Sequence, residues 1–301
     1  MNRPLPLLLV TGIAFGCNFP LGKLAVAAGV NPALWAIVIC LGAGAALAVV
    51  TQMVERAPPV PGIYRYAAIS GLISNVIPLF LTFAAIPHIG SGLAAILVAC
   101  SPVSTALISM ALKVRPPTAL GLLGIGFGLA GALVIIVARN ASFEGGDARW
   151  LFLAALIPVF LGFGNVYRTW AWPKGAGPMR LGAVVNLAAV LPLALLGWGW
   201  SGLDLAPLAS VPWLVAAQLA ASTIMYLTFF RLQAVGGPTY LSQIGYVAAV
   251  LSVAVGVTLF GETFPLTVWA GVAVVAVGIA LSTLAQVRGS RPARRGHIKT
   301  P

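Results

Sequence analysis

A long apolar pattern that occurs twice places the strongest constraint on this chain. The second copy, residues 227–262, has two apolar arms around Gly236-Gly237-Pro238. In the first copy, Leu81-Thr82-Phe83 matches Leu227-Thr228-Phe229 at an offset of 227 − 81 = 146 residues. The same offset places Gly90 on Gly236. Because a repeat of this length defines the architecture of a chain, we predict two related halves, each with a tight turn at its glycine.

The composition indicates that most of the chain lies in lipid. Hydrophobic residues make up 60% of the 301 residues, charged residues make up 7%, and the mean hydropathy is +1.03. Soluble domains carry about 25% charged residues, so a water-soluble surface is excluded. The net charge of +12 comes from basic residues between apolar runs and in the tail. This distribution favours a cytoplasmic membrane face and predicts no nucleic-acid partner.

Apolar runs of the length needed to cross a bilayer, about 20 residues, follow one another along the chain. The first is too long for the apolar core of a signal peptide. The spacing predicts an all-α membrane protein with ten transmembrane helices, at residues 1–28, 33–53, 62–86, 91–112, 118–138, 150–170, 177–200, 212–234, 239–260 and 264–286.

The helices divide into two groups of five. We expect a first repeat at 1–140, a loop at 141–148, a second repeat at 149–287 and a basic tail at 288–301. Since five is odd, the second repeat enters the membrane from the other side, and the repeats are inverted as in secondary transporters. Basic residues, Arg168 and Arg231 among them, gather on one side, while the other side has Arg139 and Arg149. This asymmetry predicts an inner (plasma) membrane protein with both termini in the cytoplasm.

Three short motifs carry a family resemblance. They are Phe15-Gly16-Cys17-Asn18-Phe19-Pro20, Ser101-Pro102-Val103, and Gly261-Glu262-Thr263 followed by Gly271 and Gly278. In this order they resemble the EamA family of the drug/metabolite transporter superfamily, whose members carry two five-helix repeats. The chain departs from the family at Phe15, where tryptophan is frequent, and at 113–116, where Lys-Val-Arg-Pro replaces a Gly-Glu pair. The resemblance implies a secondary transporter.

Polar side chains inside the predicted helices are the candidate binding residues, because such side chains usually face the protein interior. Asn18 and Asn165 occupy matching positions in the two halves, at an offset of 147. Each amide either links two helices or lines a cavity. Gln243 and Tyr246 are three residues apart and so share a helix face. The complete set of predicted substrate-binding residues is Asn18, Asn75, Ser101, Asn165, Tyr226, Gln243 and Tyr246.

Two charged residues near the outer ends of helices have specific interpretations. Lys23 either contacts an anionic group of the substrate or reaches to the membrane surface. Glu262 is expected to cap the helix that begins near Phe264. We predict no Asp or Glu near the middle of any span, which argues against a carboxylate proton relay.

The fifth predicted helix contains a series of glycines that allows close helix packing. Its members are Gly121, Gly124, Gly126, Gly128 and Gly131. The series either packs inside one chain or joins two chains, so a homodimer is left open.

The sequence as a whole predicts a transporter that is not an enzyme. Its partners are the lipid bilayer and a small organic substrate, by resemblance an amino acid or related metabolite that is exported by alternating access around a central cavity. Drug efflux and metabolite uptake remain alternatives, as do a membrane-embedded enzyme and a non-transporting scaffold. The sequence has no HExxH motif, paired Asp or His cluster. Cys17, Cys40 and Cys100 lack metal-ligand spacing, so we predict no metal and no cofactor.

Overall fold

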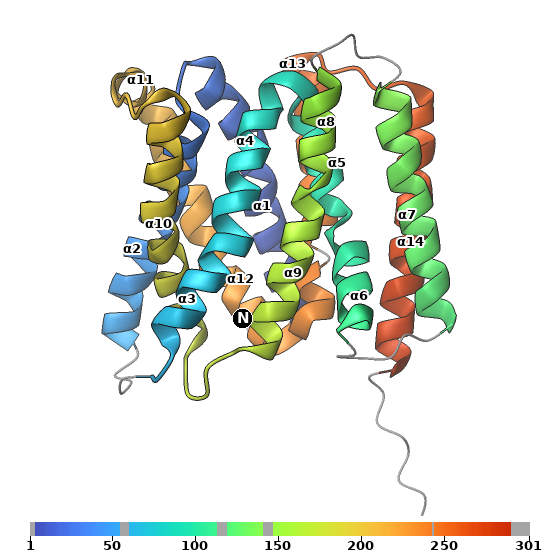
Figure 1. The fold of residues 1–301 in the computed structure, drawn as a ribbon, viewed down its shortest axis with the longest axis horizontal. Helices are drawn as coiled ribbons and strands as arrows, with labels where there is room; N and C mark the ends of the chain where they lie inside the picture. Colours follow the sequence, from blue (N-terminus) through green and yellow to red (C-terminus); the bar gives the residue numbers. More distant parts are fainter. Residues whose placement is uncertain (1–3, 55–59, 113–118, 141–146, 243, 290–301) are drawn as a thin grey trace, which may run out of the picture.

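A computed structural model describes residues 4–54, 60–112, 119–140, 147–242 and 244–289, and all elements in these ranges are helical (Figure 1). Seven helical segments are long and apolar enough to cross a membrane. They are Leu5–Ala27, Pro32–Met53, Ile63–Ile89, Ser91–Ala111, Ala148–Trp170, Pro178–Ser201 and Pro212–Val235. Three shorter apolar segments are Ala119–Ile135, Ile244–Phe260 and Leu266–Gly278. The prediction of an all-helical membrane protein is therefore confirmed.

The elements of the first half follow the predicted spans closely, although two of the spans are divided. They are α1 (Pro4–Ala27), α2 (Pro32–Val54), α3 (Ile63–Gly71), the π-helix η1 (Leu72–Val76), α4 (Ile77–Ile89), α5 (Ser91–Ala99), α6 (Ser101–Ala111) and α7 (Ala119–Asn140). Gly90 has a φ of +82°, a backbone conformation that glycine adopts without strain. The turn predicted at Gly90 is therefore confirmed.

The second half contains α8 (Asp147–Ala155), α9 (Ile157–Trp170), α10 (Pro178–Ser201), the short α11 (Ala206–Ser210), α12 (Pro212–Ser242), α13 (Ile244–Phe260) and α14 (Leu266–Gly289). The tight turn predicted at Gly236-Gly237-Pro238 is wrong, because α12 continues through these residues to Ser242. Membrane helices tolerate glycine and proline, since neighbouring groups replace the single backbone hydrogen bond that a proline removes.

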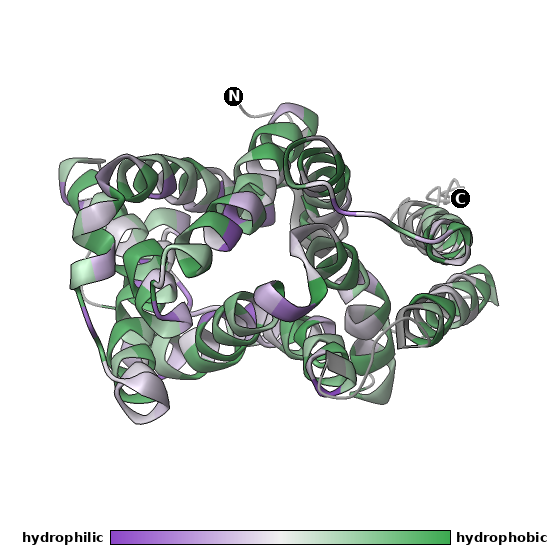
Figure 2. Ribbon diagram, turned by 90° about the horizontal axis from the view of Figure 1, so that it is seen from above, coloured by the Kyte–Doolittle hydropathy of each residue, from purple (hydrophilic) through white to green (hydrophobic). Residues whose placement is uncertain are grey.

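The helices pack mainly across the two halves of the chain. α1 lies against α12 and α13, α2 lies against α10, and α5 lies against α13. The largest side chains buried between them include Phe19, Trp35, Phe83 and Phe230. Seen from above, the helices surround a central region, and α7 and α14 form a pair at one edge (Figure 2).

Glycines allow α7 and α14 to approach closely. A Cβ atom added to Gly131 would lie 2.6 Å from the backbone nitrogen of Val275 and 2.7 Å from the carbonyl oxygen of Gly271. Gly278 on α14 is equally tight against the backbone of Gly128 and Gly124. At these positions the glycine series packs inside one chain.

Candidate functional site

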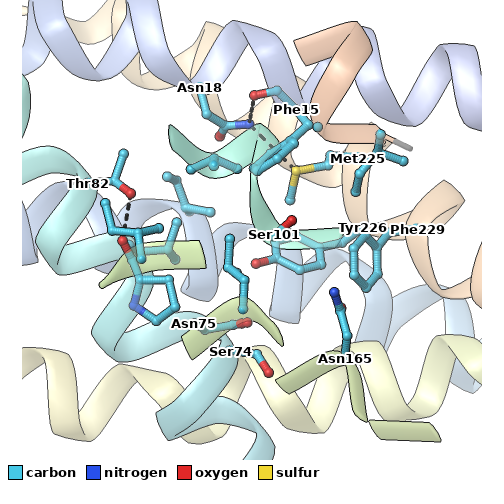
Figure 3. A pocket seen from close by; sticks show the side chains of 18 of the residues that line it. Phe15, Asn18, Ser74, Asn75, Thr82, Ser101, Asn165, Met225, Tyr226 and Phe229 are labelled. Atoms are coloured by element: carbon cyan, nitrogen blue, oxygen red, sulfur yellow. Dashed lines mark hydrogen bonds between the residues drawn. The ribbon is translucent and has the colours of Figure 1, made fainter. Parts of the chain in front are cut away.

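A cavity of about 90 Å³ lies where three helical spans are interrupted within the described residues (Figure 3). The interruptions are η1, the break at Cys100 between α5 and α6, and the break at Leu156 between α8 and α9. Each of the three is followed at once by a proline in the first turn of the next helix, namely Pro78, Pro102 and Pro158. A proline is tolerated there because its missing N–H is not needed in a first turn.

Aromatic rings and a few polar groups make up most of the cavity wall. The rings belong to Phe15, Phe19, Phe83, Tyr226, Phe229 and Phe230. The other polar side chains belong to Asn18, Ser74, Asn75, Thr82, Ser101, Asn165 and Arg168. Such a wall suits a small organic molecule with an apolar body and one or two polar groups.

The cavity brings together five of the predicted site residues, Asn18, Asn75, Ser101, Asn165 and Tyr226. Tyr246 is partly buried on α13 and does not line the cavity. Gln243 lies outside the described residues.

The amide of Asn18 joins α1 to α12. Its Nδ2 donates to the carbonyl oxygens of Ala14 and Phe15, both at 3.0 Å, and its Oδ1 accepts a 2.6 Å hydrogen bond from Nε2 of Gln218. These contacts favour the helix-linking interpretation of Asn18. Gln218 was not identified in the sequence, although it is an amide in the middle of an apolar run.

Asn75 has a similar linking contact from η1. Its Nδ2 donates to Oδ1 of Asn186 on α10 at 3.1 Å, and Nδ2 of Asn186 donates to the carbonyl oxygen of Gly182 at 2.9 Å. The buried pair Asn75–Asn186 therefore fixes η1 against α10, and its hydrogen bonds hold the interrupted span in place.

Arg168 is the main correction to the predicted site. The charge pattern of the sequence predicts it to be one of the cytoplasmic basic residues, but its side chain is 4% exposed and lines the cavity. Its Nη2 donates to Oδ1 of Asn165 at 2.5 Å, and its Cζ lies 5.1 Å from the ring centre of Phe229. Asn165 in turn donates to Oγ1 of Thr105 at 3.1 Å. The spacing of three residues between Asn165 and Arg168, which places both on one helix face, was the available signal.

A second polar cluster lies outside the cavity. It is found where α13 ends and α14 begins (Figure 1). Glu262 Oε1 accepts hydrogen bonds from Lys23 Nζ at 2.7 Å, Ser91 N at 2.8 Å and Ser91 Oγ at 2.9 Å. Its Oε2 accepts a hydrogen bond from Gly92 N at 2.9 Å. The expectation that Glu262 caps the helix near Phe264 is therefore wrong, because it caps α5. The turn at Gly90 leaves the first N–H groups of α5 free to donate.

This network also determines the ionisation of Glu262. Burial alone would raise the pKa of its carboxyl group, but hydrogen bonds from Lys23, Gly92 and Ser91 lower the pKa below the ordinary value of 4.5. Glu262 is therefore charged at neutral pH. Lys23, which lies 4.5 Å from the ring centre of Phe260, is paired with this carboxylate outside the cavity.

Comparisons with known proteins find both related sequences and a similar fold. Residues 3–137 match the model of the EamA-like transporter family, which confirms the resemblance predicted from the motifs. The chain is 28% identical over 234 residues to the "uncharacterized inner membrane transporter YedA" of Escherichia coli strains K12 and O157:H7. These matches cover 76% of this chain and 74% of each relative. A protein of known crystal structure shares the fold, with a TM-score of 0.62 and 19% identity over 93% of this chain and 96% of that one.

Proposed function

We propose that this chain, whose residues 3–137 match the EamA-like transporter family, is a secondary transporter of small organic solutes in the inner membrane. The observation that carries the proposal is the cavity enclosed by interrupted helices from both halves. Secondary transporters build their central sites from such discontinuous helices. The name of the relative YedA supports the same activity and location. Amino acids and related metabolites are the proposed substrates, exported by alternating access.

The packing partners support two inverted repeats of five spans, at 1–140 and 149–287. The first span, α1, lies against α12 and α13, and its counterpart α8–α9 lies against α4 and α6. These partners are themselves counterparts, since α4 and α12 contain the matching Leu-Thr-Phe segments. α2 pairs with its counterpart α10, and α7 pairs with α14. A twofold relation between the halves produces this exchange.

The inverted arrangement makes a prediction about topology. A reporter fused at Ala141, between the repeats, should be active on the outer side of the membrane, while one fused after Pro301 should report the cytoplasm. The reason is the excess of basic residues in the predicted cytoplasmic loops. Alkaline phosphatase and fluorescent-protein fusions measure the two locations. Both reporters on one side would contradict five spans per repeat.

Transport should be measured in proteoliposomes with a panel of labelled amino acids and other small metabolites. We expect counterflow of at least one such solute. Among the described residues, Glu262 is held by Lys23, Asp204 is exposed and accepts a hydrogen bond from Ala206 N, and neither lines the cavity. An imposed pH gradient should therefore cause no accumulation through a carboxylate relay.

The same assay decides between this proposal and its alternatives. Accumulation driven by the gradient and abolished in Glu262→Gln would contradict the coupling prediction. Correctly inserted protein that moves no solute of the panel would favour a scaffold over a transporter. Empty liposomes and liposomes with the protein heated beyond unfolding serve as controls for leakage.

A further inference from the structure

Arg168 is a buried charge without a protein counter-charge in the described part of the chain. Its side chain is 4% exposed. The two carboxylates whose side chains are described are used elsewhere, since Glu262 pairs with Lys23 and Asp204 is exposed. A buried ion without a partner is strongly unfavourable. A group that enters the cavity and carries negative charge would remove this cost.

The hydrogen bonds around Arg168 indicate what kind of group is missing. A guanidinium has five N–H donors and no acceptor. One donor of Arg168 is used by Asn165, while Nε–H has no partner. The missing partner must therefore be an acceptor, and a planar carboxylate matches the guanidinium with two parallel hydrogen bonds.

Another unpaired donor lies on the neighbouring helix. The hydroxyl of Ser74 on η1 faces the same cavity and has no protein partner. α3 and η1 both pack against α9, which carries Arg168. Hydroxyl groups that donate beside a guanidinium favour an oxyanion over a neutral group.

The rest of the cavity determines the other part of the ligand. Phe229 lies directly against the guanidinium, and Phe15, Phe19 and Phe83 extend the apolar wall. Among the described residues that line the cavity, none is Asp or Glu. The wall therefore suits an apolar body attached to the anionic group.

We propose that Arg168, together with Ser74 in the same cavity, binds the carboxylate of the solute, and that the substrates are small organic acids with an apolar body. This inference rests on the proposed function and narrows its substrate class. The carboxylate of an apolar amino acid meets the same requirement.

Binding of benzoate and of its neutral analogue benzamide to the purified chain in lipid nanodiscs tests the charge requirement. Isothermal titration calorimetry should show that benzoate binds at least about tenfold more tightly than benzamide, the effect of one charged hydrogen bond. Arg168→Gln should abolish this preference, and Arg168→Lys should retain part of it. Arg231→Gln is the matched control, because Arg231 is an exposed arginine on α12.

Thermal unfolding separates binding from a purely structural role in which Arg168 stabilises the end of α9. Without ligand, Arg168→Met should unfold at the same temperature as the wild type or higher, because it removes an uncompensated charge. Benzoate should raise the unfolding temperature of the wild type and of Arg231→Gln, but not that of Arg168→Met.

Three results would overturn the inference. These are equal binding of benzoate and benzamide, binding of neither, and a fall in the unfolding temperature of Arg168→Met with benzoate binding unchanged. Counterflow of neutral solutes together with one of these results would leave the transporter proposal intact. The absence of counterflow for every solute, with the benzoate preference present, would instead count against transport.

Discussion

Replacing Gly131 by alanine should lower the free energy of unfolding by about 1–3 kcal/mol, the usual cost of inserting a methyl group into a fully packed contact. The new Cβ would lie 2.6 Å from the backbone nitrogen of Val275 and 2.7 Å from the carbonyl oxygen of Gly271. Backbone atoms cannot rotate away as the end of a side chain can. The two helices α7 and α14 must therefore separate along their contact.

Gly126 on the same helix provides the matched control. A Cβ added there meets no atom within 4 Å. Gly126→Ala should leave the free energy of unfolding unchanged or raise it by up to about 1 kcal/mol, the difference in helix propensity between glycine and alanine. Thermal unfolding in detergent, followed by tryptophan fluorescence, measures both variants. Equal stability of Gly131→Ala and Gly126→Ala would refute the close contact between α7 and α14.

Glu262→Ala should destabilise the fold by about 2 kcal/mol. The carboxylate accepts four hydrogen bonds that join α1, the N-terminus of α5 and the segment before α14. Its loss leaves Lys23 and two backbone N–H groups without a partner. The estimate lies between the values for buried and surface ion pairs, because the Glu262 side chain is 10% exposed and that of Lys23 is 27% exposed.

The stability that Glu262 contributes should also depend on pH in one direction. Its pKa in the folded chain lies below the ordinary value of 4.5, so its contribution is complete at pH values above 4.5. The contribution is lost as the pH falls from 4.5 through the lower pKa of the folded chain. The unfolding temperature of the wild type should therefore fall more steeply below pH 4.5 than that of Glu262→Gln.

Controls for this network come from the chain itself. Asp204→Asn removes an exposed acid and should change the free energy of unfolding by less than about 0.5 kcal/mol. The free energies of unfolding of Lys23→Met, Glu262→Gln and the double variant together give the coupling energy between the two side chains. A coupling energy close to zero would mean that the ion pair contributes nothing beyond the backbone hydrogen bonds of Glu262.

The sequence predicted the helices better than it predicted the contacts of their side chains. Apolar length and flanking glycine or proline located most boundaries within a few residues, and Gly90 was correctly placed in a turn. The same signals failed at Gly236-Gly237-Pro238, where α12 continues. A local pattern cannot report whether neighbouring helices replace a lost hydrogen bond.

The candidate site was predicted only in part for a similar reason. Asn18 and Asn165 stood out because a buried amide is rare in an apolar run, and both line the cavity. Arg168 was assigned to the membrane surface because it lies near the end of its helix, but its side chain turns into the cavity beside Asn165. The helices packed around α9, among them α6 and η1, determine that direction, and a local sequence pattern does not report them.

The pairing of α7 with α14 places a requirement on the biosynthesis of the chain. The ribosome produces α7 long before α14, and chains begin to fold as they emerge. Until α14 is inserted, the glycine face of α7 lacks the partner that Gly131 and Gly128 contact in the finished protein. The helices made before α14 therefore lack this contact until the last helix is translated and inserted. A messenger RNA truncated before the α14 codons should yield a chain in which the glycine face of α7 is exposed to lipid and to membrane proteases.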